Sequence, residues 1–241
     1  MCYCKHLFTS VAGCYLEMTS ELVHTPKQTR SQDTQERVLR ALEEMLGERF
    51  FEQITIRDLA ARTGVATGTI YRRFKDKEAL LPVLYERFDH TISEWAEGFW
   101  DDFDLDTELR LEARIRHLVG KHVAFYKAHA PILRTVYLYM RLHGELSVED
   151  IDQKRQSLYA HMLEPVISAL ATEEQVKPGV DQIMLFLLLL LSSVNERVLF
   201  GDVKPARTLQ MDDEAFITGL TDALHAYLGT CPTGRGGSAN T

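Results

Sequence analysis

Residues 55–80, TIRDLAARTGVATGTIYRRFKDKEAL, carry the signals for two short helices joined by a turn. Thr55 and Asp58 are three residues apart, so each side chain can accept a hydrogen bond from the other residue's backbone amide, an arrangement called a capping box. Gly64 then supplies the residue type that most easily adopts the positive φ found at helix ends. The stretch therefore predicts a helix that starts near Ile56, a turn at Gly64, and a second helix.

The second helix separates apolar from polar side chains. Ile70 and Phe74 lie four residues apart and point to the same, inward side. The other faces carry hydroxyls, a phenol and two guanidinium groups, from Thr67, Thr69, Tyr71, Arg72 and Arg73. Such a surface suits the major groove of duplex DNA, where arginine binds guanine and threonine can contact thymine. Arg57 and Arg72 are the preferred candidates for reading bases.

Positive charge is concentrated in the same stretch. Six Lys and Arg residues and two Asp residues give residues 55–77 a net charge of +4, whereas the whole chain has a formal charge of −8. The remaining residues therefore carry −12. A basic patch on an acidic protein is expected of a phosphate-binding footprint. The alternative is a solvated cationic helical hairpin.

The stretch resembles the DNA-binding signature of the tetracycline-repressor (TetR) family. The residues that carry the resemblance are Thr55, Leu59, Ala60, Thr63, Gly64, Val65, Gly68, Thr69, Ile70, Tyr71, Phe74, Lys77, Glu78 and Leu80. The resemblance implies a homodimeric, all-helical regulator. It also implies an N-terminal three-helix DNA-binding domain and a larger C-terminal domain that dimerises and usually binds a small-molecule effector.

By the same resemblance, Arg57 and Thr69 fall at base-contacting positions, and Tyr71 and Lys77 at phosphate-contacting positions. The family commonly has Ser or Thr where this chain has Ala66, so the start of the groove-facing helix and the role of Thr67 stay open. The full set of predicted DNA-binding residues is Thr55, Arg57, Thr67, Gly68, Thr69, Tyr71, Arg72, Arg73 and Lys77.

The sequence predicts an all-α fold with two domains. Asp33 and Glu36 form a second capping box ahead of a helix at about 34–46, which completes a three-helix DNA-binding domain at residues 31–78. Residues 79–228 are predicted to form the larger domain for effector binding and dimerisation. Further helices are expected at about 77–100, 108–128, 130–142, 149–171, 179–200 and 212–228.

The two ends of the chain are predicted to be disordered, as an N-terminal extension of residues 1–30 and a tail of residues 229–241. Met18 is an alternative start, so whether residues 1–17 belong to the native protein stays open.

Pro82 lies near the start of the predicted helix 77–100, which Asp76 is expected to cap. Because proline lacks a backbone N–H, it should bend this helix or delay its regular start. The resemblance implies that this helix carries the effector signal to the DNA-binding domain. The alternative is a kink without function.

Aromatic, Met and His side chains of the middle helices are the candidates for an effector pocket, although such side chains more often pack helices together. They are Trp95, Phe99, Phe125, Tyr126, Tyr137, Met140, His143, Tyr159 and Met162. His122 and His129 lie seven residues apart. They are interpreted as satisfied structural histidines, because a metal site needs further ligands.

The predicted helix at 179–200 is apolar on almost all sides, so a single chain can hardly bury it. With the amphipathic helix at 212–228, it resembles the helix pair that forms a four-helix dimer interface. The candidate contacts are Leu188, Leu191, Val194 and Leu224. A core within one subunit is the alternative.

Other classes of protein have less support. All 4 cysteines lie outside the two predicted domains, which favours a reducing, cytoplasmic location without disulfides. The longest apolar run, residues 183–191, is shorter than the ~20 residues that span a bilayer. No cofactor or metal set is indicated. An enzyme is not predicted, since no nucleophile and base pair or glycine-rich phosphate loop is found.

The sequence thus predicts a transcriptional regulator, a repressor that binds a palindromic operator as a homodimer and is released by a small-molecule effector. Its partners would be double-stranded DNA, a second copy of the chain and the effector, with no membrane. The alternative is a helical ligand-binding or interaction protein that does not bind an operator.

Overall fold

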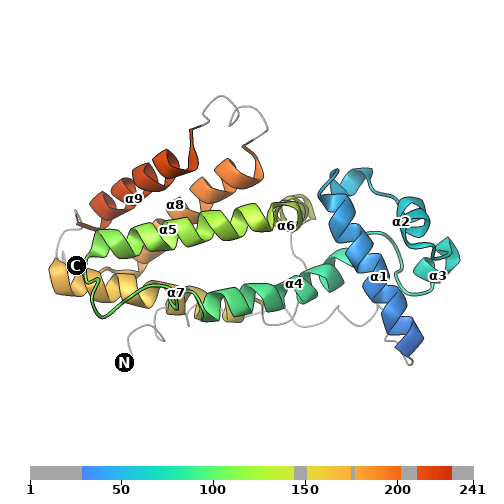
Figure 1. Ribbon diagram of the computed structural model, residues 1–241, viewed down its shortest axis with the longest axis horizontal. Coiled ribbons are helices and arrows are strands. Elements are labelled where there is room, and N and C mark those ends of the chain that lie inside the picture. The colour runs from blue at the N-terminus through green and yellow to red at the C-terminus, as the bar shows by residue number, and fades with distance from the viewer. Residues whose placement is uncertain (1–28, 144–150, 175–176, 202–210, 230–241) are drawn as a thin grey trace, which may run out of the picture. The chain divides into compact units, whose positions relative to one another are not determined.

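The computed structural model describes residues 29–143, 151–174, 177–201 and 211–229, and the regular elements in these ranges are helices (Figure 1). They are α1 (Thr29–Leu46), η2 (Phe51–Gln53, a 3₁₀ turn), α2 (Ile56–Thr63), α3 (Thr67–Tyr71), α4 (Leu80–Glu97), α5 (Leu111–Ala128), α6 (Ala130–His143), α7 (Ile151–Glu173), α8 (Val180–Val194), η3 (Asn195–Leu199, a π-helical turn) and α9 (Asp213–Gly229). The predicted all-α fold is confirmed.

Every predicted helix is present close to its predicted position. α1 begins at Thr29 rather than near residue 34, and the predicted helix 179–200 changes from α8 to η3 at Asn195. The four cysteines, Met18, the N-terminal extension up to residue 28 and the tail from residue 230 lie outside the described residues.

The described residues form two compact units. The N-terminal unit comprises the described residues of 13–94 and 129–151, and the C-terminal unit those of 95–128 and 152–229. The predicted domain boundary between residues 78 and 79 stays a prediction.

In the N-terminal unit, α1, α2 and α3 share one apolar core. Leu42 of α1, Leu59 of α2 and Ile70 of α3 are each at most 1% exposed. Phe74, which follows α3, is also buried, as its spacing from Ile70 predicts. The core fixes the two short helices of residues 55–80 on the longer α1.

The sixth helix also belongs to the N-terminal unit, where α6 packs against α1. The Arg134 guanidinium of α6 lies 4.8 Å from the centroid of the Phe50 ring. The His129 ring, just before α6, lies 5.1 Å from the Phe88 ring of α4. The α1 packing and the Phe50 contact join α6 to the predicted DNA-binding domain, and the Phe88 contact joins it to α4.

The start of α4 explains the position of Pro82. The Asp76 carboxylate accepts a 2.8 Å hydrogen bond from the Ala79 N–H, as expected of a capping residue, and α4 begins at Leu80. Pro82 therefore lies in the first turn, where backbone N–H groups have no partner within the helix. This position matches the predicted delay of the helix start.

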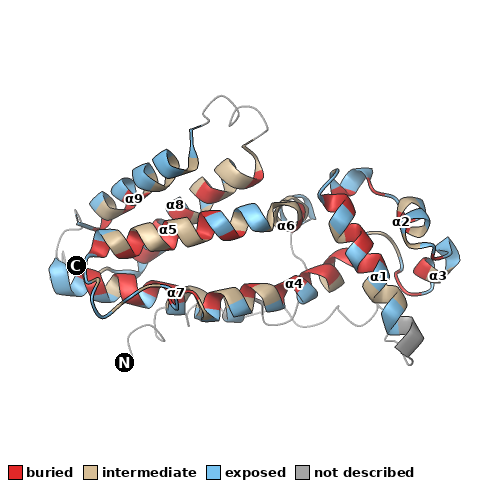
Figure 2. Ribbon diagram, in the orientation of Figure 1, coloured by how far each residue is buried: buried red, intermediate tan, exposed pale blue. Residues whose placement is uncertain are grey.

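In the C-terminal unit, apolar residues of α5, α7, α8 and α9 form one core, visible as the buried sides of these helices in Figure 2. Leu111, Leu170 and Leu190 of this core have no exposed surface. The buried Arg114 of α5 donates hydrogen bonds to three backbone carbonyls, including a 2.7 Å bond to Pro165 of α7. These bonds satisfy its guanidinium and tie α5 to α7.

Candidate functional site

α2 is fixed at its start by the predicted capping box. The Thr55 hydroxyl accepts a 3.1 Å hydrogen bond from the Asp58 N–H, and the Asp58 carboxylate accepts a 2.9 Å bond from the Thr55 N–H. The bond from the Thr55 amide is the main reason why the pKa of Asp58 is lowered. At the other end, Gly64 has a φ of 68°. Both predicted signals are confirmed.

The polar face of α3 is open to solvent. Thr67, Gly68, Tyr71 and Arg72 are exposed, and Tyr71 is 55% exposed although it is aromatic. The Arg72 guanidinium donates a 3.0 Å hydrogen bond to the hydroxyl of Thr69. This bond holds the charged group over the outer side of α3.

The start of α3 settles the position of Thr67. α3 begins at Thr67, its capping position is Ala66, and no side chain caps it. Thr67 is therefore not the capping residue, and its side chain is exposed.

Gly68 has no neighbour that requires a glycine. A Cβ atom built at this position meets no other atom within 4 Å. The missing side chain instead leaves the α3 backbone uncovered on its exposed face. A bare backbone allows another molecule to approach closely.

Arg73 does not lie on the exposed face, which corrects its assignment to the groove-facing surface. The residue is only 7% exposed, and its guanidinium donates a 2.6 Å hydrogen bond to the Gln35 side chain of α1. Burial lowers the pKa of Arg73. The reason is helical spacing: Arg73 follows Ile70 by three residues and so lies on the inward side with Ile70 and Phe74.

Lys77 and Thr55 make contacts within the N-terminal unit. The Lys77 ammonium donates a 3.0 Å hydrogen bond to the Phe51 carbonyl and lies 4.4 Å from the centroid of the Phe51 ring. The Thr55 hydroxyl is bonded to Asp58. Both residues thus have a structural role, and a DNA contact by either stays a prediction.

Lys75 is an exposed cation that the predicted DNA-binding set omitted. Like Arg57 and Arg72, it makes no ion pair with the residues that the structure describes. Arg62, by contrast, lies 2.8 Å from the Glu48 carboxylate. Within residues 55–77, the exposed cations without an ion pair to any described residue are therefore Arg57, Arg72 and Lys75. Lys75 lies outside the recognised motif residues, and only its charge in the sequence pointed to it.

Comparison with known proteins agrees with this arrangement. Residues 38–84 match the family model described as "Bacterial regulatory proteins, tetR family". This part of the chain thus belongs to the TetR family. A curated protein to which the chain is similar is the uncharacterized HTH-type transcriptional regulator YvdT of Bacillus subtilis (strain 168). The two are 27% identical over 157 residues, which cover 65% of this chain and 75% of the relative.

Solved structures of putative TetR-family regulators share the fold. The structure from Rhodococcus sp. has a TM-score of 0.54 and 13% identity, and covers 81% of this chain and 99% of its own. The structure from Mesorhizobium loti MAFF303099 has a TM-score of 0.52 and 16% identity, and covers 83% and 98%. At these identities the likeness shows the fold alone.

Four of the predicted effector residues belong to an aromatic cluster in the C-terminal unit. The Trp95 ring stacks on Phe125 with 4.2 Å between centroids, and lies 5.1 Å from both Phe99 and His122. The Tyr126 ring lies 6.4 Å from His122. His122, which was interpreted as a structural histidine, is at the centre of these rings, and its burial lowers its pKa to about 4.

The other effector candidates are distributed over both units. Tyr137, Met140 and His143 lie on α6 in the N-terminal unit. The exposure of Met140 and His143 argues against a place for them in an enclosed pocket. On α7, Met162 is 2% exposed in the core, and burial raises the pKa of Tyr159.

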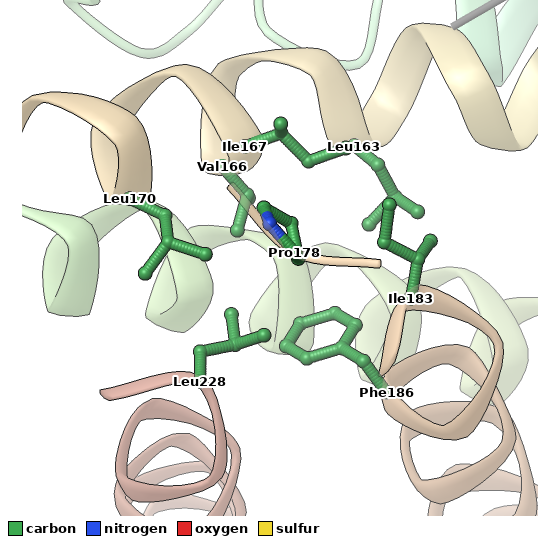
Figure 3. A pocket seen from close by; sticks show the side chains of 8 residues that line it. All are labelled: Leu163, Val166, Ile167, Leu170, Pro178, Ile183, Phe186 and Leu228. Atoms are coloured by element: carbon green, nitrogen blue, oxygen red, sulfur yellow. The ribbon is translucent and has the colours of Figure 1, made fainter. Parts of the chain in front are cut away.

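An apolar hollow of about 250 Å³, part of it open solvent, lies between α7, α8 and the end of α9 (Figure 3). Its lining consists of Leu163, Val166, Ile167, Leu170, Pro178, Ile183, Phe186 and Leu228. None of the predicted effector residues is among them. In the sequence these side chains have the same apolar spacing as the core, so no signal distinguished them.

One side of α8 is apolar and exposed. Five large side chains on this side are between 40% and 60% exposed, namely Val180, Met184, Leu185, Leu188 and Leu189. We call this set the α8 stripe. Of the predicted dimer contacts, Leu188 belongs to it and Leu191 is half-buried beside it.

Val194 and Leu224 are corrections to the predicted dimer contacts. They are 0% and 1% exposed and lie in the core of a single subunit. Helical spacing explains the difference, because Val194 follows Leu190 by four residues and so shares the buried side of α8. The two sides of an apolar helix cannot be told apart by composition.

The segment Val180–Leu199, α8 with η3, is long and apolar enough to cross a membrane by length and composition alone. A core helix passes the same test, and α8 buries Ile183, Phe186, Leu187, Leu190 and Val194. Within the described ranges, no three His, Cys, Asp or Glu side chains come together as a metal site.

Proposed function

We propose that this TetR-family regulator is a repressor that binds a palindromic operator as a homodimer and is released by a small-molecule effector. The observation that carries the proposal is the exposed polar face of α3 with the cations Arg57, Arg72 and Lys75. This face is held on a buried core of three helices. DNA binding needs both a rigid element that enters the groove and cations for the phosphates.

The exposed residues form two groups, one proposed to contact bases and the other to contact phosphates. Arg57 and Arg72 supply guanidinium groups that can bind O6 and N7 of guanine, and Thr69 can contact a neighbouring base. Tyr71 and Lys75 supply a phenol and an ammonium for phosphate oxygens, which set position but carry no sequence information. The bond between Arg72 and Thr69 preorganises the guanidinium, which lowers the entropy lost on binding.

The homodimer is proposed to form through the α8 stripe and the adjoining exposed side of α9. A row of exposed large apolar side chains marks a contact surface. The exposed side of α9 carries small residues, including Ala215, Thr218, Gly219 and Ala223, which allow a second helix to come close. A second copy would cover both helices, because a two-fold axis brings identical surfaces together.

An effector can release the protein from DNA only if it binds the DNA-free state more tightly than the DNA-bound state, because the two binding equilibria are linked. The aromatic cluster around Trp95 and His122 is the proposed effector region. α5 carries His122 and ends at Ala128, α6 begins at Ala130, and α6 packs against α1. A change at α5 would thus have a short route along the chain to the DNA-binding helices.

The experiment that tests this function is selection of bound DNA from a random pool, followed by titration of the selected and a scrambled duplex at two salt concentrations. The proposal predicts an inverted repeat, bound more tightly than the scrambled duplex at both salt concentrations. A reporter gene placed behind the selected sequence should be repressed by the protein. Equal, weak binding to both duplexes would favour the alternative, an interaction protein without an operator.

A further inference from the structure

The imidazole of His122 has only one of its two nitrogens satisfied. Nδ1 lies 2.8 Å from the Leu118 carbonyl and must donate to it, since a carbonyl only accepts. In the neutral ring the lone pair is then on Nε2. Nε2 is enclosed, and no group in the described part of the chain forms a hydrogen bond with it. A buried acceptor without a donor is unfavourable, so a donor from another molecule would be stabilising.

The surroundings of this acceptor are aromatic. The Trp95 ring stands edge-on to His122 at an interplanar angle of 86°, and the Phe99 and Tyr126 rings lie 5.6 Å and 6.4 Å away. Trp95 and Tyr126 are only half-buried, so the cluster extends from the buried histidine to the surface of the C-terminal unit. Aromatic walls and a single polar atom are typical of a site for a small organic ligand.

We propose that Nε2 of His122 accepts a hydrogen bond from the hydroxyl or N–H group of a neutral aromatic effector enclosed by Trp95, Phe99 and Tyr126. This inference rests on the proposed effector function and specifies the chemical class of its ligand. Because Nε2 is enclosed, binding requires the half-buried Trp95 and Tyr126 side chains to move aside.

The neutral state of His122 disfavours an anionic group at Nε2. A carboxylate has no proton to donate, so it would bind here only if the imidazole were protonated. Burial opposes protonation, and no charged side chain contributes to the lowered pKa of His122. The preferred ligand is therefore a neutral hydrogen-bond donor with an aromatic body.

His117 provides a matched comparison on the same helix. Its ring is also surrounded by aromatic side chains, with Trp100 at 4.9 Å and Phe103 at 4.7 Å. Its Nε2, however, lies 3.0 Å from the Phe99 carbonyl and is satisfied within the chain. Aromatic neighbours alone thus do not distinguish the proposed site, whereas the unpaired nitrogen does.

The test compares phenol with anisole, which has the same ring but no hydroxyl proton. Binding to the full chain without DNA is measured by calorimetry and by tryptophan fluorescence, with benzoate as the anionic probe. Phenol is expected to bind roughly tenfold more tightly than anisole and more tightly than benzoate. His122→Phe should abolish the preference for phenol, and His117→Phe should retain it.

Equal affinity for phenol and anisole, or no binding of either, would overturn the inference, because Nε2 would then be satisfied by water or be inaccessible. A preference for phenol that survives in folded His122→Phe would also overturn it. If circular dichroism shows that His122→Phe is unfolded, His122→Gln, which retains an acceptor, should keep part of the preference. Operator binding by the wild-type chain, measured without any probe, tests the proposed function separately.

Discussion

Arg72 is the exposed guanidinium whose position on α3 is best defined, because Thr69 holds it. We predict that Arg72→Ala relaxes the preference at one base pair of the operator at a cost of about 1–3 kcal/mol. Stability should not change, since the side chain is exposed. Titration against operators with single base-pair changes measures the effect. An equal loss at every position would show that Arg72 contacts phosphate instead.

Lys75 and Lys77 should behave differently from Arg72 and from each other. Lys75→Ala and Lys77→Ala are both expected to weaken binding to operator and scrambled DNA alike and to reduce the salt slope by about 1. Only Lys77→Ala should also lower the unfolding midpoint, because the Lys77 ammonium bonds the Phe51 carbonyl. Thermal melts and titrations at two salt concentrations separate the two effects. If Lys77→Ala behaved like Arg72→Ala, the division into base and phosphate contacts would be wrong.

A substitution at Gly68 should affect DNA binding without destabilising the fold. Gly68→Ala should leave stability equal or raise it by up to about 1 kcal/mol, because the new methyl group meets open space within a helix. It should weaken operator binding if the α3 backbone approaches DNA closely. The control is Gly120→Ala in α5, where a Cβ also meets open space. The control should gain stability without loss of DNA affinity, and equal affinities for both variants would contradict a close approach at residue 68.

His122 should make stability depend on pH. Its pKa is about 4 in the folded protein against an ordinary value of 6.5, so between these values the unfolded chain binds a proton that the folded chain does not. The free energy of unfolding should therefore have its full value with respect to His122 above about pH 6.5. It should fall as the pH drops toward 4, by up to about 3 kcal/mol. Denaturant melts across this range should show a steeper fall for the wild type than for His122→Phe. Parallel curves would contradict the burial of a neutral imidazole.

At the scale of elements, the exposed side of α8 predicts how the protein associates. Leu188→Glu should shift the protein toward a monomer, because it introduces a charge at the most exposed residue of the α8 stripe, where Leu188 is 60% exposed. Leu109→Glu is the control, since Leu109 is 56% exposed but lies before α5. Sedimentation equilibrium measures both. A wild-type chain that is monomeric at micromolar concentration, or a dimeric Leu188→Glu variant, would exclude this interface.

The elements themselves were largely predictable, because their signals are local. The Thr55 and Asp58 capping box, the turn at Gly64 and the inward pair Ile70 and Phe74 depend on residues within a few positions of each other. These signals located α2 and α3, and the same kind of periodicity located the longer helices.

The details of the site were less predictable, because they depend on tertiary contacts. The burial of Arg73 requires a partner on α1, Gln35, which is far away in sequence. The buried side of α8 depends on the position of α5 and α9, and an apolar helix gives no periodicity that would reveal it. The unpaired nitrogen of His122 depends on which groups surround the ring, and no spacing in a single sequence shows this.

At the scale of the whole molecule, a symmetric dimer would carry two α3 helices related by a two-fold axis. The operator should then be an inverted repeat whose half-sites are separated by about one helical turn of DNA, 10–10.5 base pairs, or by a multiple of it. An effector that binds preferentially to the DNA-free arrangement would weaken operator binding by the same factor by which the operator weakens effector binding.

The most direct test of the central claim is sedimentation of the protein with the selected operator and with a duplex in which one half-site is scrambled. The account predicts a complex of two chains on the intact inverted repeat, with binding strongly reduced when one half-site is lost or when Arg72 is replaced by Ala. A single chain on the intact operator, or equal binding to the intact and scrambled duplexes, would contradict it.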